Sequence, residues 1–180
     1  FAGGDFTTFG GQESSGIVRL DIAGTVDPTF SPSLGADGPV YSLVVEPGGS
    51  VVLGGAFSLL DLRPRKGIGR LQVDGSVDTL FDPGTGADGP VYTVTRQSDG
   101  RLLIGGVFEN FNGTRRAGVS RMLLTGKVDT SFLDTAYNQF AGLPKRATTS
   151  PTPFVTALAI QSRGALIIGG ALPNVGGGLD

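Results

Sequence analysis

A pair of adjacent glycines that recurs at a fixed spacing is the feature that most constrains the fold of this chain. The pair follows a short apolar run, such as Val51-Val52-Leu53 before Gly54-Gly55. Its four copies are Gly3-Gly4, Gly54-Gly55, Gly105-Gly106 and Gly169-Gly170. The first three copies lie 51 residues apart, and the last follows after 64. An apolar run that ends in glycines predicts a buried strand whose end lies against another backbone, with no room for a side chain.

Each repeat predicts four short strands. In the second repeat an alternating apolar run at 40–45 leads through a tight turn to the strand at 51–55. A loop of roughly ten residues then leads to a third strand at 67–71, and a short turn leads to a fourth at 77–81. No segment has a helical apolar period. Because four antiparallel strands in about 50 residues are typical of a propeller blade, we predict an all-β chain: a β-propeller of four-stranded antiparallel blades, about 51 residues per repeat, incomplete in this chain.

The repeat boundaries divide the chain into five parts. We predict a partial blade at 1–34 (the first unit), a blade at 35–85 (the second unit), a blade at 86–136 (the third unit), an insertion loop at 137–152 and a partial blade at 153–180 (the last unit). The insertion explains the longer last spacing, and its prolines and basic residues predict an exposed loop. The first unit lacks a first strand, and the last lacks its third and fourth. We therefore expect either further blades of the same protein or association between copies.

Three motifs carry a resemblance to a known family. They are the strand that ends in Gly-Gly-x-Phe, the Arg-Leu-turn-Gly segment at 70–75 and the Val-Asp-x-x-Phe segment at 77–81. Together they resemble the delta-60 repeat family, and the glycine pair with its following hairpin is similar to a distant kelch-type blade. The resemblance implies a bacterial protein that is extracellular or on the cell surface, without an agreed biochemical role.

The composition argues against an active site. The chain has no His and no Cys, so it lacks the commonest general base and the thiolate metal ligands. We expect no catalytic residue, no metal and no cofactor. An Arg and an Asp do recur once per unit, as Arg70 and Asp78 in the second unit. They could form a ring of functional groups, but we favour a structural ion pair that cross-links each outer hairpin.

Basic residues gather in the loops that should share one face of the propeller. They come from the loops between second and third strands and from the insertion: Arg63, Arg65, Lys66, Arg115, Arg116, Lys145 and Arg146. Two interpretations remain open: a solvated surface, or an arc that docks an anionic partner through the planar guanidinium forks.

Three functions are compatible with these features. The leading hypothesis is a non-catalytic structural or protein-interaction module of a bacterial surface or secreted protein. The alternatives are a module that binds an acidic glycan or anionic polymer through the loop face, with Tyr137 and Phe140 as exposed aromatic candidates, and a non-catalytic part of a larger enzyme. The net charge of −2 and the lack of a long apolar stretch indicate neither a nucleic-acid partner nor a membrane span.

Overall fold

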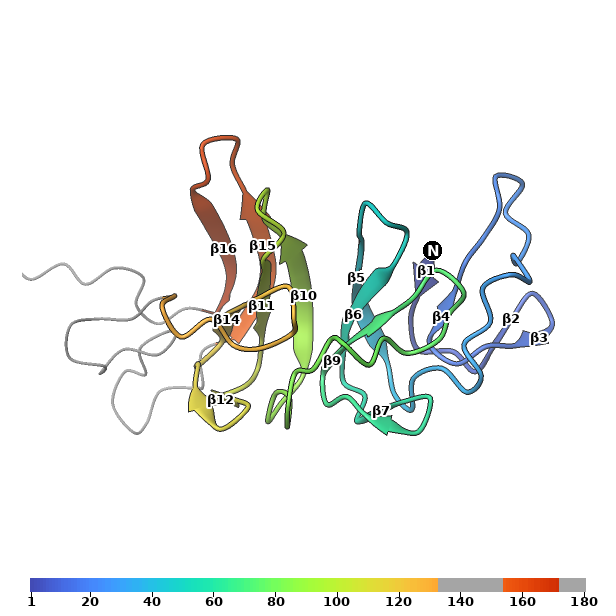
Figure 1. Cartoon of the computed structure of the whole chain (residues 1–180), viewed down its shortest axis with the longest axis horizontal. Helices are drawn as coiled ribbons and strands as arrows, with labels where there is room; N and C mark the ends of the chain where they lie inside the picture. Colours follow the sequence, from blue (N-terminus) through green and yellow to red (C-terminus); the bar gives the residue numbers. More distant parts are fainter. Residues whose placement is uncertain (133–153, 172–180) are drawn as a thin grey trace, which may run out of the picture.

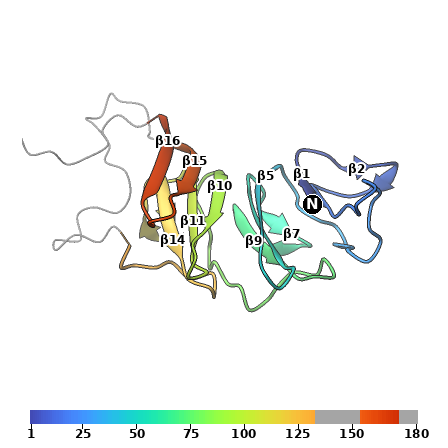
Figure 2. The same ribbon diagram turned by 90° about the horizontal axis from the view of Figure 1, so that it is seen from above.

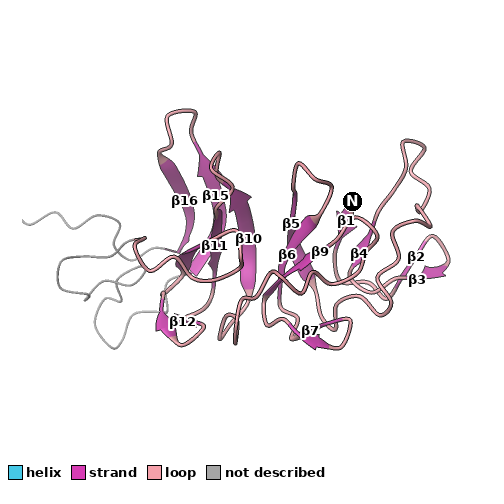
Figure 3. Cartoon of the chain, viewed as in Figure 1, coloured by secondary structure: helices cyan, strands magenta, loops and turns pink. Residues whose placement is uncertain are grey.

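A computed structural model of the chain describes residues 1–132 and 154–171. Within these residues all regular structure is β, and no helix occurs (Figure 3). The sheets stand side by side in chain order, from the first unit to the last (Figures 1 and 2). The predicted insertion at 137–152, with Lys145 and Arg146, lies outside the described residues, as do Tyr137 and Phe140.

The second and third units form matching antiparallel sheets of three strands. In the second unit the order is β5 (Val40–Val45), β6 (Val51–Gly55) and β9 (Ile68–Leu71). In the third it is β10 (Val91–Arg96), β11 (Leu102–Gly106) and β14 (Val119–Met122). The predicted fourth strand is reduced to one isolated bridge in each unit, Leu71 with Val77 and Met122 with Val128. Each blade is thus a three-stranded sheet with a short bridged segment at its outer edge.

The first and last units form smaller sheets of two strands. In the first unit β1 (Ala2–Gly3) pairs with β4 (Ile17–Val18), and Leu20 bridges to Val26. In the last unit β15 (Phe154–Ile160) pairs with β16 (Leu166–Ala171). The described sheets are small and do not close into a ring (Figure 2).

Short hairpins occupy the segments that we predicted as loops between second and third strands. They are β2 (Thr8–Phe9) with β3 (Gln12–Glu13), β7 (Leu59–Leu60) with β8 (Arg63–Pro64), and β12 (Asn110–Phe111) with β13 (Thr114–Arg115). A backbone bridge from the preceding link holds two of them, Ala36 to Leu60 and Ala87 to Phe111. The loop face is therefore built of repeated, hydrogen-bonded hairpins.

The core lies between neighbouring sheets, because the second strands of the second and third units, β6 and β11, bury both of their faces. Val51 and Leu53 pack in a cluster with Ile17 and Phe30 of the first unit. Val52, between them, packs in a second cluster with apolar residues of the third unit. Alternate side chains of one strand thus join the sheets on either side, as expected for a strand covered on both faces.

The two glycines of each pair have different neighbours. A Cβ atom on Gly55 would collide with the carbonyl oxygen of Pro39, so this glycine lies against a backbone, as the sequence predicted. A Cβ atom on Gly54 would instead lie 2.6 Å from Cγ2 of Val94 in the third unit. A Cβ atom on Gly105 would also lie against a valine of the next sheet, at 2.5 Å from Cγ1 of Val155, which corresponds to Val91 in the third unit. The first glycine therefore makes room for a valine of the next sheet.

Candidate functional site

The recurring arginine and aspartate form an ion pair on the outer side of each sheet. In the second unit Nε of Arg70 donates to Asp78 at 2.8 Å, and the guanidinium lies 4.8 Å above the ring of Phe81. The other carboxylate oxygen of Asp78 accepts the amide of Leu80. The first unit repeats the arrangement with Arg19, Asp27 and Phe30, and the third with Arg121, Asp129 and Phe132. These groups bind one another, which supports the structural interpretation.

The same arginines also connect neighbouring units, which the sequence analysis did not predict. Nη1 of Arg19 donates to the carbonyl of Val73 at 2.7 Å, and Nη1 of Arg70 donates to the carbonyl of Leu124 at 3.3 Å. Both acceptors lie in the turn before the fourth-strand segment of the next unit. The 51-residue spacing of Arg19 and Arg70 indicated in the sequence that the two arginines are equivalent. The spacing alone does not show which unit each arginine contacts.

Hydrogen bonds lower the pKa of two of the recurring aspartates, Asp27 and Asp129. The hydroxyl and amide of Thr29 donate to Asp27 and, with Arg19, lower its pKa. Burial opposes the ionisation of Asp129, but hydrogen bonds from Ser131 and Arg121 outweigh it, so that the pKa of Asp129 is also lowered. At neutral pH these carboxylates are hydrogen-bond acceptors and do not hold a proton to donate.

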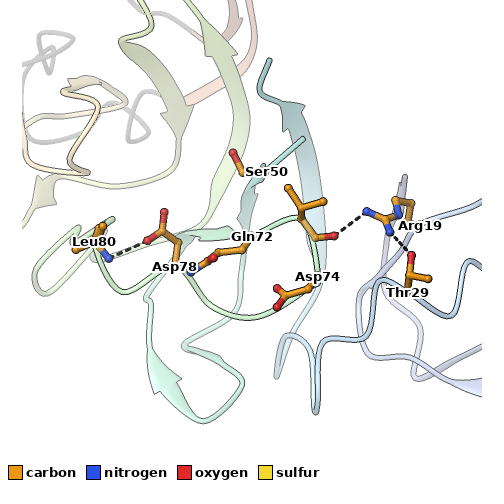
Figure 4. A pocket seen from close by; sticks show the side chains of 8 residues that line it. Arg19, Thr29, Ser50, Gln72, Asp74, Asp78 and Leu80 are labelled. Atoms are coloured by element: carbon orange, nitrogen blue, oxygen red, sulfur yellow. Dashed lines mark hydrogen bonds between the residues drawn. The ribbon is translucent and has the colours of Figure 1, made fainter. Parts of the chain in front are cut away.

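A groove with a volume of about 590 Å³ lies between the first and second units (Figure 4). Arg19 and Thr29 line it from the first unit, and the second unit contributes the other lining residues: Ser50, Gln72, Val73, Asp74, Asp78 and Leu80. Arg19 donates to the carbonyl of Val73 and to the hydroxyl of Thr29, as Figure 4 shows. Most polar groups of this groove thus already stabilise the fold.

A small residue, Ser50, lines the groove where the next unit has a long side chain. In the third unit Arg101 takes the place of Ser50, one repeat later. Its guanidinium lies 3.0 Å from Asp99 and 3.6 Å from Asp129. The long side chain therefore reaches the carboxylate that corresponds to Asp78, whereas Ser50 cannot. The side chain at this position of the repeat therefore differs between the second and third units.

The basic residues of the predicted arc do not all lie on the surface. Arg63 on β8, Arg115 on β13 and Lys66 are exposed. Arg65 is half-buried and donates to the carbonyl of Pro64. Arg116, which we expected on the arc, is 5% exposed and donates to the carbonyls of Arg115 and Thr130. The described part of the arc therefore presents three exposed cations.

The sequence contained a signal for this difference. Arg65 and Arg116 are 51 residues apart and therefore occupy the same position of the repeat, whereas Arg63 and Arg115 do not. At the repeated position the arginine stem packs on the third strand, since a Cβ atom on Gly69 would lie 3.4 Å from Cβ of Arg65. Repeated arginines thus belong to the scaffold, and the unrepeated ones face solvent.

Two small hollows recur between successive units on the loop face. One of about 220 Å³ is lined by Lys66 and Asp88, and one of about 180 Å³ has Ser15 and Asp37 at the same positions. Oδ1 of Asp37 accepts the amides of Ser58 and Leu59, each at 2.7 Å. Asp88 likewise accepts the amides of the next hairpin. The recurring Asp of the Gly-Ala-Asp-Gly-Pro link thus fixes the start of a hairpin, a role that we had not predicted.

Comparison with known proteins agrees with this architecture. A family model described as a domain of unknown function (DUF5122) β-propeller matches residues 1–30 and 97–132. No curated protein matches the chain. In the part of the chain that the structure describes, no helix is long and apolar enough to cross a membrane. The family match and the helix-free β fold together support a β-propeller repeat family for this chain.

Proposed function

We propose that this chain is a non-catalytic structural or protein-interaction module, of the delta-60 and kelch-like type, in a bacterial surface or secreted protein. The observation that carries the proposal is that the recurring polar residues serve the scaffold. Arg19 and Arg70 bind an aspartate of their own unit and a carbonyl of the next, and Asp37 and Asp88 bind hairpin amides. Repeats whose polar groups stabilise one another are suited to presenting a surface.

The surface most suited to a protein partner is the loop face. Its exposed cations Arg63, Lys66 and Arg115 lie on or next to the hairpins of the second and third units. These cations occupy different positions of the repeat in the two units, so the charge pattern of this face is not repeated from unit to unit. An Arg fork is suited to the carboxylates of an acidic protein surface because it donates two parallel hydrogen bonds.

A photo-crosslinking experiment tests the proposal. In the protein as its own host makes it, a photoreactive amino acid replaces Arg115. In a matched control it replaces the exposed Arg163, which lies in the turn between β15 and β16 and not on the loop face. We expect a defined partner, identified by mass spectrometry, to be crosslinked at position 115 and not at 163. Equal crosslinking at both positions, or none at 115, would count against the loop face.

The second candidate is binding of an acidic glycan by the same face, and the three exposed cations favour it. The double variant Arg63→Ser with Arg115→Ser is compared with the charge-matched Lys127→Ser with Arg163→Ser, whose residues are also exposed. Binding to polygalacturonate is measured at low and physiological salt. We expect the first pair alone to weaken binding and to reduce its salt dependence, because exposed charges are screened over about 8 Å at physiological salt.

A further inference from the structure

The recurring aspartate has fewer hydrogen-bond donors in the second unit than in its neighbours. In the first and third units it accepts from the arginine and from both the amide and the hydroxyl of the residue two positions later; these residues are Arg19, Asp27 and Thr29, and Arg121, Asp129 and Ser131. From the residues that the structure describes, Asp78 accepts only Nε of Arg70 and the amide of Leu80. Leucine has no hydroxyl, so one acceptor position on the Asp78 carboxylate stays open to the groove that it lines.

The charge of Asp78 is also shared differently. Arg70 lies 2.8 Å from Asp78 and 3.3 Å from Glu46, so one guanidinium serves two carboxylates in the second unit. The side chains of all three residues are largely withdrawn from solvent, at 11–16% exposed. A second cation beside Asp78 would therefore balance a charge that the unit itself leaves in excess.

The third unit shows which cation fits at such a carboxylate. Arg101 occupies the repeat position of Ser50 and also lies beside Asp99. Its guanidinium lies 3.6 Å from Asp129, the equivalent of Asp78. The third unit thus supplies a second guanidinium from its own chain, whereas the second unit has a short serine at that position.

Apolar side chains accompany the open acceptor in the groove. Leu80 and Val73 both line it and are 82% and 51% exposed. Figure 4 shows the Asp78 carboxylate between Leu80 and Ser50. Arg19 lines the groove as well, but Asp27 balances its charge at 2.9 Å. A carboxylate beside exposed aliphatic side chains suits a ligand with a cationic head on an aliphatic stem.

From these features we infer that the groove binds an arginine side chain of a protein partner. The guanidinium donates to the open position of Asp78, as Arg101 faces Asp129, and the aliphatic stem packs on Leu80. An arginine suits this site better than a lysine because its planar fork offers parallel donors to a carboxylate. The lining residues lie outside the hairpins of the loop face, so the inference does not depend on the function proposed for that face.

Two peptides test the inference on the 180-residue chain. The peptide acetyl-Gly-Arg-Gly-amide is titrated into the isotope-labelled protein and followed by nuclear magnetic resonance, and the matched peptide carries citrulline, which has nearly the same shape and no charge. We expect saturable shifts of the Ser50, Asp78 and Leu80 amide signals with the arginine peptide. The citrulline peptide should bind roughly tenfold more weakly or worse, because a charge-assisted hydrogen bond is about twice as strong as a neutral one.

Substitutions in the groove identify the site. Ser50→Arg places a guanidinium beside Asp78 from within the chain and should abolish binding of the arginine peptide. The charge-matched control Ser33→Arg, at an exposed position outside the groove, should bind as the parent does. Leu80→Ser supplies the missing hydroxyl and removes the apolar contact, so it should also weaken binding, without a change of charge.

The spectra of the free variants show whether each one keeps its fold. Equal binding of the two peptides, or undiminished binding by both Ser50→Arg and Leu80→Ser, would overturn the inference. Shifts that do not saturate, or that fall equally in Ser50→Arg and Ser33→Arg, would show a general attraction between charges and would overturn it as well.

Discussion

Replacing Gly54 by Ala should destabilise the contact between the second and third units. The added Cβ would lie 2.6 Å from Cγ2 of Val94 and 3.1 Å from Cγ1 of Val91. Contacts under 3.0 Å do not persist between such atoms, so the third sheet must shift or Val94 must change its rotamer. Both valines are buried, and the core around them has little space for either movement.

The size of the effect follows from two opposing terms. Inserting a methyl group into a packed core costs about 1–3 kcal/mol. Replacing Gly by Ala also restricts the unfolded chain, which stabilises the protein by about 0.4–1 kcal/mol. We therefore expect Gly54→Ala to lower the free energy of unfolding by about 1–2 kcal/mol, or the melting temperature by roughly 2–8 °C for a chain of this size.

Gly169→Ala is a matched control, because it adds the same methyl group at the same position of the repeat. Its Cβ would have no neighbour nearer than 3.5 Å. The packing cost is therefore absent, and the variant should be neutral or more stable by up to about 1 kcal/mol. Chemical denaturation of the two variants and the parent chain measures both values.

A double-mutant cycle identifies the atom that causes the loss. Val94→Ala removes Cγ2 and should destabilise the parent chain by emptying part of the core. In the Gly54→Ala background the same change also relieves the collision. The double variant should therefore lose less stability than the sum of the losses in the two single variants. If Gly54→Ala is as stable as Gly169→Ala, or if the two losses are additive, the first glycine does not serve to admit the valine.

Three further predictions concern the ion pairs and the groove. Arg70→Ala should destabilise the chain by about 1–3 kcal/mol in chemical denaturation, because it leaves Asp78 without its partially buried partner. As a control, Arg163→Ala at an exposed position should change stability by less than about 0.5 kcal/mol. The pKa of Asp129 is lowered in the folded chain from its ordinary 3.8. Its contribution to stability is therefore present above about pH 4 and is lost as the pH falls through the lower folded pKa. In an acid titration followed by circular dichroism, the stability of Asp129→Asn should depend less on pH in this range than that of the parent chain. Ser50→Arg should bring a guanidinium toward Asp78, as Arg101 lies 3.6 Å from Asp129 in the next unit, and should raise stability by less than about 1 kcal/mol in a salt-dependent way. A gain that is independent of salt would contradict the ionic explanation.

Local patterns predicted those parts of the fold in which a residue and its partner lie in the same unit. The alternating runs, tight turns and glycine pairs predicted the antiparallel order β5-β6-β9 and the contact of Gly55 with a backbone. Phe81, the last residue of the Val-Asp-x-x-Phe segment, is fully buried. The fourth strand was overestimated, because Val77 makes only one bridge and the amide of Leu80 then donates to the side chain of Asp78 instead of to a neighbouring strand.

The contacts between units were not predictable from one unit alone. The Arg19 side chain reaches Val73, 54 residues later, and Gly54 receives Val94, 40 residues later. A repeat spacing shows that such positions are equivalent in each unit, but it does not show whether they meet within a unit or across units. For the same reason Arg116 was expected on the surface, although its equivalence to Arg65 indicated a scaffold role.

Repetition itself separates the scaffold from the candidate binding residues in this chain. A residue at a repeated position has the same neighbours in every unit, so it is selected by packing, as Arg19 and Arg70 are by their ion pairs and their carbonyl contacts. A residue that departs from the repeat is not required by the packing that the units share. Arg63 and Arg115 depart from it and are exposed, whereas the repeated Arg116 is buried. The search for a partner should therefore begin with the exposed residues that the repeat does not require.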